Sequence, residues 1–309
     1  MTHFNGIYRT TDHDINAFPQ SDPITVHHFD SENPGPHLLM LSGIHAGTES
    51  IPTAASYTAI NMIKDGMLPL TRGKITFIPL CNPLALIEKK RFVDVNLNRV
   101  MHKHDTPKFY EEHIANIITD YIDDADAVID LHTQSTPSVP FLFNDYPQIS
   151  SDLARSLNIK IMVTGWPEAF ATKDDLFNDG DTSSYACTQN IPSVCVECGY
   201  NKDPMAAVIA LKTTILGMKY LGITEDIYTN KKTIRHINIQ EGISMPEKAE
   251  FVKEFYNFEA VAKGTPLLQN TQTKETIISA PYDCVLVLPK KWASPGIEAF
   301  FYAIEKEDT

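Results

Sequence analysis

Long apolar runs and a basic, apolar leader are both absent from this sequence. No stretch approaches 18 continuous apolar residues, and the first residues, Met-Thr-His-Phe-Asn-Gly, carry no basic start. We therefore expect neither a membrane-spanning helix nor a secretory signal, and no membrane partner. Cysteine is also scarce, and its five residues are an odd number, which indicates reduced thiols in a cytoplasmic protein.

Positive charge is in short supply as well. Lysine and arginine number 26 against 39 acidic residues, which gives a formal net charge of −13. Because phosphate neutralisation requires clustered cations, this balance argues against a nucleic-acid partner. An anionic substrate would need local cationic groups, since the field of the whole protein would repel it.

What the sequence does contain is an alternation of apolar strands and helical patterns. Short apolar runs predict strands over residues 37–41, 74–80, 127–131, 159–163 and 193–197. Helical spacing predicts helices over 51–66, 108–122 and 204–221. This alternation indicates an α/β fold, with a mixed, mostly parallel sheet and helices on both faces.

The pattern changes near residue 225. From Thr233 onward, short apolar runs such as 276–280 and 284–288 are broken by Gly, Pro and Asn. We interpret this part as a small C-terminal all-β domain. A chain of 309 residues is long enough for one large and one small domain, so we predict domains over 1–225 and 226–309.

Several side chains capable of chemistry lie where predicted strands end, and His45 is the first of them. In open α/β sheets, ligands gather beyond the carboxyl ends of the strands. A His and a Glu as close as His45 and Glu49 can reach one metal ion, and zinc accepts both imidazole nitrogen and carboxylate oxygen. A surface His before a Glu in the first turn of a helix would look the same.

The segment Asp130-Leu-His132 could complete such a site. Residues 130 and 132 share one face of a strand, so the carboxylate can accept the second imidazole N–H and orient the ring as a ligand. A capping or core histidine is the alternative. With His45 and Glu49, His132 makes a two-His, one-carboxylate set that leaves one coordination position for water, as in catalytic zinc sites.

Two further elements carry polar groups. An acid at the end of an apolar strand, such as Glu197, is costly unless it is paired or catalytic, and it could exchange protons with water and a leaving amine. A solvated strand-end Glu is the alternative. In the segment 91–99, Arg91 and Arg99 could bind carboxylates in a bidentate way or stabilise an oxyanion, whereas a solvated loop is the default interpretation.

The order and spacing of four motifs resemble the succinylglutamate desuccinylase/aspartoacylase family, whose members are related to zinc carboxypeptidases. Five segments carry these four motifs, since the second motif comprises both Asn82-Pro83 and the stretch from Arg91 to Arg99. They are Gly43-Ile-His45-Ala-Gly-Thr-Glu49, Asn82-Pro83, Arg91-Phe-Val-Asp94-Val-Asn-Leu-Asn98-Arg99, Asp130-Leu-His132-Thr133 and Val196-Glu197-Cys-Gly199. They resemble the family's Gly-x-His-Gly-Asn-Glu, Asn-Pro and Arg-x-x-Asp-x-Asp-Leu-Asn-Arg motifs, the segment with its second zinc histidine and the segment with its general base. The resemblance covers residues 35 to 220 and continues more weakly beyond them.

The resemblance implies one zinc ion per chain, bound by His45, Glu49 and His132. Glu197 would be the general base and acid. The larger domain would then be the catalytic domain of a zinc-dependent amidohydrolase, which acts on carbon–nitrogen bonds other than peptide bonds.

The resemblance also implies how a substrate would bind. Arg91 would polarise the scissile carbonyl and hold the oxyanion, while Asn98 and Arg99 would bind a substrate carboxylate. The expected substrate is a small molecule, an N-acyl amino acid. Its acyl group and amino acid cannot be derived from the sequence, and residues 141–147 and 165–181 are expected to supply side chains to its pocket.

The sequence departs from the family pattern in two places. His45-x-x-x-Glu49 has one residue more than the family's His-x-x-Glu, so either the loop absorbs the extra residue or Glu49 is not a ligand. Asn96 stands where the family has an aspartate, and this difference concerns the groups around the metal ligands and the positioning of the substrate. Cys195 and Cys198 form a C-x-x-C, but positions three apart on a strand face opposite sides, so we interpret both as packing residues.

Two other functions stay open at this point. A metallocarboxypeptidase would use the same chemistry on peptides, with a different pocket. A catalytically inert metal- or ligand-binding protein on this fold would result if the extra residue displaced Glu49. The C-terminal part resembles a domain that restricts large substrates in the family, which favours an N-acyl amino acid by analogy. A homo-oligomer is left open, because an interface strand looks like any other strand.

Overall fold

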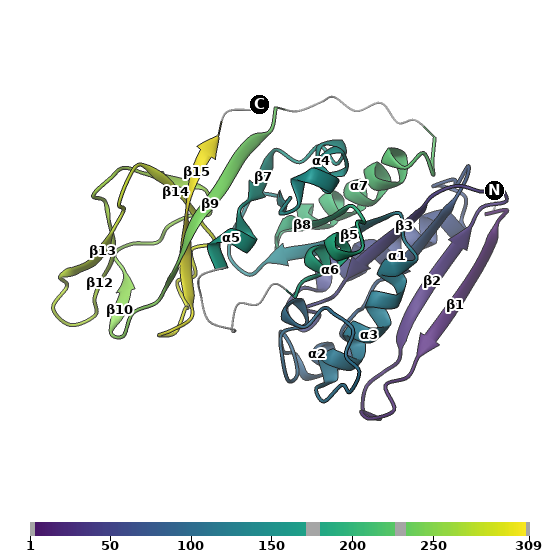
Figure 1. The fold of residues 1–309 in the computed structure, drawn as a ribbon, viewed down its shortest axis with the longest axis horizontal. Helices are drawn as coiled ribbons and strands as arrows, with labels where there is room; N and C mark the ends of the chain where they lie inside the picture. The colour runs from purple at the N-terminus through teal and green to yellow at the C-terminus, as the bar shows by residue number, and fades with distance from the viewer. Residues whose placement is uncertain (1–3, 171–179, 226–232, 307–309) are drawn as a thin grey trace.

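A large mixed β-sheet extends through most of the molecule (Figure 1). The computed structural model describes residues 4–170, 180–225 and 233–306. Within them, twelve strands form the sheet in the order β1-β2-β4-β3-β5-β8-β6-β7-β9-β15-β14-β11. Their bounds are β1 (Ile7–His13), β2 (Ile24–Asp30), β3 (His37–Ser42), β4 (Lys74–Ile78), β5 (Ala127–Gln134), β6 (Phe141–Phe143), β7 (Ile161–Thr164), β8 (Ser193–Tyr200), β9 (Arg235–Ser244), β11 (Glu259–Val261), β14 (Cys284–Val287) and β15 (Glu298–Lys306).

The centre of the sheet is parallel and buried on both faces. Strand β3 pairs in parallel with β4 and β5, and β5 pairs in parallel with β8. Leu38 and Met40 pack into one apolar cluster and Leu39 and Leu41 into another, because successive side chains of a strand point to opposite faces. The pairs toward both edges of the sheet are mainly antiparallel, as β1 with β2 and β14 with β15.

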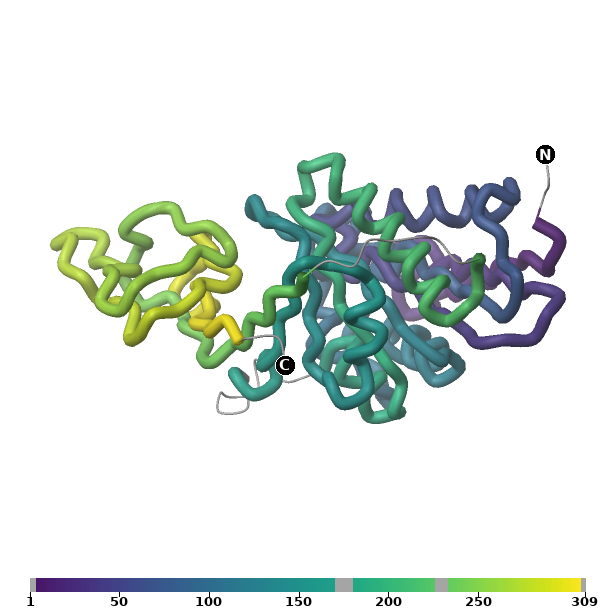
Figure 2. Tube along the Cα trace, turned by 90° about the horizontal axis from the view of Figure 1, so that it is seen from above, coloured from purple at the N-terminus to yellow at the C-terminus, as the bar shows by residue number. Residues whose placement is uncertain are grey.

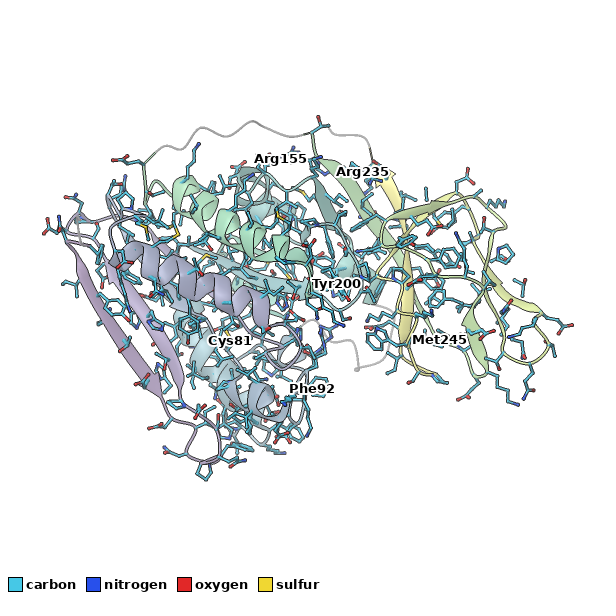
Figure 3. The ribbon with its side chains drawn as sticks, turned by 180° about the vertical axis from the view of Figure 1, so that it is seen from behind. Cys81, Phe92, Arg155, Tyr200, Arg235 and Met245 are labelled. Atoms are coloured by element: carbon cyan, nitrogen blue, oxygen red, sulfur yellow. The ribbon has the colours of Figure 1, made fainter. Side chains whose placement is uncertain are left out.

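Helices cover both faces, which confirms the predicted fold class. The cluster with Leu38 and Met40 contains residues of α1 (Ser50–Lys64), α4 (Pro147–Ser156) and α7 (Met205–Tyr220). Figure 3 shows α1 and α7 side by side over this face. The cluster with Leu39 and Leu41 contains residues of α2 (Pro83–Glu88), α3 (Tyr110–Asp123) and α6 (Thr182–Thr188). The short helix α5 (Trp166–Phe170) follows β7, and a single 3-10 turn, η1 (Leu97–Arg99), precedes α3.

The C-terminal part is rich in β-structure and extends from one end of the α/β body (Figure 2). Strand β9 pairs with β7 in parallel and with β15 in antiparallel orientation, so the large sheet continues into this part without a break. A second, antiparallel sheet is formed by β10 (Ala249–Phe251), β12 (Pro266–Asn270) and β13 (Thr276–Ser279). The boundary expected between 225 and 226 stays a prediction, and residues 226–232 lie outside the described part of the chain.

None of the helices in the described ranges has the length and apolar character that crossing a membrane requires.

Candidate active site

The site lies at the carboxyl ends of the central parallel strands. His132 is near the end of β5, and Glu197 is its register partner on the adjacent strand β8. The chain leaves β3 at Ser42 and reaches His45 in the loop that leads to α1. Since the carboxyl ends of parallel strands meet at one edge, these residues are brought together as the sequence predicts.

A tight turn brings Glu49 back to His45. The backbone N–H groups of Thr48 and Glu49 both donate to the carbonyl oxygen of His45, at 2.9 and 3.0 Å. A turn closed between residues i and i+4 is one turn of helix, so it directs both side chains to the same side. The Nδ1 atom of His45 lies 3.1 Å from Oε1 of Glu49. The loop therefore absorbs the extra residue, and the spacing does not remove Glu49 from the cluster.

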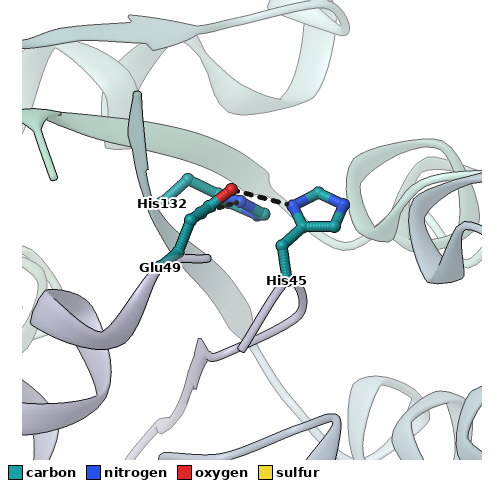
Figure 4. Close-up of side chains that lie close together, drawn as sticks. All are labelled: His45, Glu49 and His132. Carbon is teal, nitrogen blue, oxygen red and sulfur yellow. Dashed lines mark hydrogen bonds and ion pairs between the residues drawn. The ribbon is translucent and has the colours of Figure 1, made fainter. Parts of the chain in front are cut away.

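The carboxylate of Glu49 lies between the two imidazole rings (Figure 4). Its Oε2 atom is 3.1 Å from Nδ1 of His132 and accepts the backbone N–H of Thr133, also at 3.1 Å. One ligand atom from each of His45, Glu49 and His132 can be chosen so that all three lie within 4.8 Å of one another. The two imidazoles and one carboxylate are buried and could hold a metal ion.

The far nitrogen of each ring has a polar neighbour. Nε2 of His45 lies 2.9 Å from Oδ1 of Asn96, and Nε2 of His132 lies 2.9 Å from Oδ2 of Asp130. Thr182 donates its hydroxyl to the same Asp130 oxygen at 2.9 Å. Polar neighbours of this kind orient a ligand histidine, and in both rings Nδ1 faces Glu49.

Burial and charge determine the protonation of the cluster. Burial lowers the pKa of His45 to about 4, and Arg91 acts in the same direction, so this ring is neutral. Burial favours the neutral form of Glu49, but His45 and His132 together hold its pKa well below the usual value. Burial also opposes a charge on His132, yet the nearby Asp130 raises its pKa well above the usual value. The cluster thus favours a cation beside its carboxylates.

The donor set fits zinc. Two imidazole nitrogens and one carboxylate form a set found in catalytic zinc sites, where a fourth position is open. The acids Glu49 and Asp130 are 4% and 0% exposed, and buried carboxylates are stable only when cations or hydrogen-bond donors compensate them. A divalent cation between His45, Glu49 and His132 would supply this compensation.

The other predicted residues lie around the same cavity. Arg91, Asn98, Arg99 and Glu197 all line a cavity of about 430 Å³ together with the cluster. Arg91 donates its Nη1 to Oε1 of Glu49 at 3.1 Å. The guanidinium of Arg99 lies 5.9 Å from the ring centre of Trp166, which also lines the cavity. Asn98 is buried in η1.

Glu197 is the buried acid of the cavity. Burial raises the pKa of Glu197 to about 7, and the charge of Glu49 acts in the same direction, while His132 and Arg91 oppose it. Within the described residues, its Oε2 atom has no hydrogen-bond partner. A carboxyl group with such a pKa can both accept and donate a proton near neutral pH.

Sequence reasoning expected by analogy that the C-terminal part restricts large substrates, but it named no residue of that part. The cavity residues from this part are Leu288, Lys290, Trp292, Gly296, Ile297 and Glu298. No local motif marks them, because only the packing of distant strands brings them to the site. Residues from the two expected loop regions do line the cavity, namely Phe143, Asp145, Trp166 and Asp181, but 171–179 lie outside the described residues.

Cys195 and Cys198 are separate free thiols. Cys195 lines the cavity, whereas Cys198 packs into the apolar cluster on the other face of β8. This agrees with the expectation that positions three apart on a strand face opposite sides.

Comparison with known proteins gives a consistent result. The catalytic-domain model of the succinylglutamate desuccinylase/aspartoacylase family matches residues 34–215. No curated protein matches the sequence. Among solved structures, a succinylglutamate desuccinylase/aspartoacylase from Rhodobacter sphaeroides is similar with a TM-score of 0.77 and 16% identity, over 99% of this chain and 98% of that one.

Two further solved structures are similar over nearly the full length. A succinylglutamate desuccinylase from Vibrio parahaemolyticus has a TM-score of 0.71 and 16% identity, over 97% of this chain and 92% of that one. A product-bound ectoine utilization protein from Ruegeria pomeroyi has a TM-score of 0.73 and 17% identity, over 96% and 94% of the two chains. At these identities the likeness shows the fold alone.

Proposed function

The chain belongs to the succinylglutamate desuccinylase/aspartoacylase family, and from this premise we propose that it is a zinc-dependent hydrolase that cleaves the amide bond of a small N-acyl amino acid. One observation carries the proposal. The buried cluster of His45, Glu49 and His132 lines the same cavity as two arginines and a buried acid.

His45, Glu49 and His132 would hold the zinc ion. When bound, zinc lowers the pKa of water and stabilises negative charge on oxygen. Glu197, whose pKa is raised to about 7 by burial, would accept the proton of the attacking water. The attack forms the new C–O bond, and the same carboxyl group would then donate that proton to the amine as the amide C–N bond breaks.

The arginines would act on the two ends of the substrate. Arg91 lies beside Glu49, where its guanidinium can donate to the oxygen of the scissile carbonyl as negative charge develops there. Arg99 and Asn98 would bind the substrate carboxylate, since guanidinium groups pair with carboxylates in a bidentate way. These local cations offset the repulsion that a chain of net charge −13 exerts on an anion.

The cavity residues contributed by the C-terminal part favour a small substrate. A cavity of about 430 Å³ suits a molecule of limited size, and Lys290 and Trp292 line it on the side of the β-rich part. A peptide would have to extend past these C-terminal residues. We therefore propose an N-acyl amino acid rather than a peptide as the substrate.

The first experiment is the zinc content per chain of protein purified without an affinity tag. We expect about one zinc per wild-type chain and its loss in His132→Ala. His102→Ala, which changes an exposed histidine outside the cluster, is the matched control and should retain the metal. Wild-type protein that binds no zinc even after incubation with the ion would contradict the zinc site.

The second experiment offers N-acyl amino acids and short peptides side by side and measures the released amine. Turnover of the N-acyl amino acids supports the proposal. Turnover of peptides alone would instead favour a metallocarboxypeptidase, and no turnover by a zinc-loaded chain would favour a binding protein.

A further inference from the structure

One buried carboxylate outside the cavity has no role in the chemistry described so far. Glu111 lies in the first turn of α3 and is 0% exposed. Four donors converge on it. Its Oε1 accepts the backbone N–H of Val93 at 2.6 Å and Nδ2 of Asn82 at 3.1 Å. Its Oε2 accepts the backbone N–H groups of Asp94 and Val95, both at 3.1 Å.

Three of these donors are successive amides of an irregular segment. Residues 91–96 belong to no helix or strand, so no regular ladder of hydrogen bonds holds them. Successive backbone N–H groups in such a segment form a concave site for an anion, and the Glu111 carboxylate fills it. The bonds are charge-assisted, and an acid in the first turn of a helix is favoured by the helix dipole.

In a second contact, the irregular segment supplies the acceptor and helix α3 supplies the donor. Asp94 accepts the backbone N–H of Tyr110 on its Oδ2 at 2.9 Å, so the segment caps α3 while α3 holds the segment. Asn82 extends the connection, since it donates to Glu111 and accepts the N–H of Ala85 at the start of α2. The segment is thus fixed to two helices by side chains rather than by secondary structure.

The segment held in this way supplies polar side chains to the site. Arg91 precedes the three bound amides, and Asn96, Asn98 and Arg99 follow them. Asn96 also contacts Nε2 of His45. We propose that Glu111 is a positioning residue, whose carboxylate holds the amides of residues 93–95 and thereby sets the place of Arg91 on one side and Asn96 on the other. Its effects on turnover and on zinc affinity rest on the proposed function, whereas its effect on the segment does not.

Wild-type protein provides the first test. The amides of Val93, Asp94 and Val95 should exchange with deuterium slowly, at least tenfold more slowly than loop amides of similar exposure, although they lie outside helices and strands. Exchange at the rate of a free loop would overturn the proposal without any mutation.

Two variants test the consequence for the site. Glu111→Gln replaces one acceptor oxygen by an amide group, which cannot accept the backbone N–H it faces. Glu111→Asp keeps the charge but withdraws it by one methylene group. The control is Thr119→Val, at a side chain that is also 0% exposed on α3 but donates within its own helix, to the carbonyl oxygen of Asn116.

We expect both Glu111 variants to exchange faster over residues 91–99 while the amides of β3 keep the wild-type rate. We also expect about tenfold weaker zinc binding in a chelator competition, as is typical when a partner of a ligand histidine is disturbed. The variants should lower kcat by a larger factor than the factor by which they change KM. Thr119→Val should match the wild type in all three.

A merely structural role gives a different result. In that case exchange would rise evenly across the chain, zinc affinity would match that of Thr119→Val, and the proposal would be overturned. If the chain binds no zinc or no substrate is found, the exchange measurement still decides on Glu111, so failure of this inference is distinct from failure of the hydrolase proposal.

Discussion

Glu197 combines two properties that are unfavourable for stability and useful for chemistry. It is 8% exposed, and one of its oxygens has no hydrogen-bond partner within the described residues. Burial raises its pKa to about 7. Because the folded-state pKa is above that of the unfolded chain, the metal-free fold favours the protonated form. The resulting stability is present below pH 4.5 and is lost as pH rises through 7.

Glu197→Gln should therefore stabilise the metal-free protein at pH 8, by about 1 to 3 kcal/mol, and give no gain at pH 4.5. The same variant should lose about 100- to 10,000-fold in turnover, since an amide cannot exchange the proton. Urea unfolding at the two pH values measures the first effect. Glu247→Gln, at an exposed position, is the control, and a gain of equal size in that variant would contradict the assignment.

For Arg91 we expect a large effect of substitution on activity and no effect on zinc content. Arg91→Ala should lower kcat about 100- to 1000-fold, which is typical for loss of one oxyanion donor. Zinc content should stay at the wild-type level, because the arginine is not part of the donor set. Arg72→Ala, at an exposed arginine, should leave both unchanged. Near wild-type turnover of Arg91→Ala would exclude the oxyanion role.

Glu49 shows how far the sequence alone could be used at this scale. The residue types and the strand-end positions of the two histidines predicted a cluster of His45, Glu49 and His132, and the structure brings these three side chains together. They could not decide whether one extra residue displaces the carboxylate, because that depends on how the backbone turns. The bond from the N–H of Glu49 to the carbonyl of His45 decides it, and no side-chain pattern encodes that bond.

Among the elements, the loop between β3 and α1 depends on close contact with the chain after α2. A Cβ atom at Gly47 would collide with the carbonyl oxygens of Ala85 and Lys90. The glycine therefore lets the turn of His45 and Glu49 lie directly against the segment that leads to Arg91. Only glycine allows backbones to approach so closely.

Gly47→Ala should push these two segments apart. We expect a loss of stability of about 2 kcal/mol or more, together with weaker zinc binding, because a clash with backbone cannot relax through a side chain. Gly222→Ala is the control, since a Cβ there meets no atom within 4 Å and only its positive φ adds strain. Equal zinc affinity in the two variants would show that the close contact does not shape the site.

Prediction of the elements succeeded where the hydrophobic pattern was strong and failed where it was weak. The buried strands β3, β5 and β8 read as short apolar runs and were found. Strand β1 was not, since it is mostly exposed and its sequence, IYRTTDH, lacks a clear alternation. Its place is determined by antiparallel pairing with β2, which is information about a partner strand rather than about its own residues.

For the whole molecule, the main consequence of the fold is that distant parts of the chain share one cavity. Lys290 and Glu298 form an ion pair of 2.6 Å in the C-terminal part, yet both line the cavity with His45 and Arg99. Lys290 adds a third cation to Arg91 and Arg99. The sequence could not reveal this, because the contact depends on how the strands pack.

Lys290→Met keeps the apolar stem and removes the charge. We expect KM for a carboxylate-bearing substrate to rise about tenfold, which corresponds to about 1.4 kcal/mol, while zinc content is unchanged. Lys274→Met is the matched control, since Lys274 also forms a 2.6 Å pair, with Glu250, but lies outside the cavity. An equal change of KM in both variants would indicate a general effect of charge.

The pairing of β7 with β9 makes the two ends of the molecule parts of one hydrogen-bonded sheet. Apolar residues of β6 and β7 also share a cluster with those of β9, β14 and β15. Heat should therefore melt both ends in one calorimetric transition. A ligand that binds only the folded site adds its binding free energy to the whole transition, so occupancy of the metal cluster would raise the melting temperature of strands that never touch it.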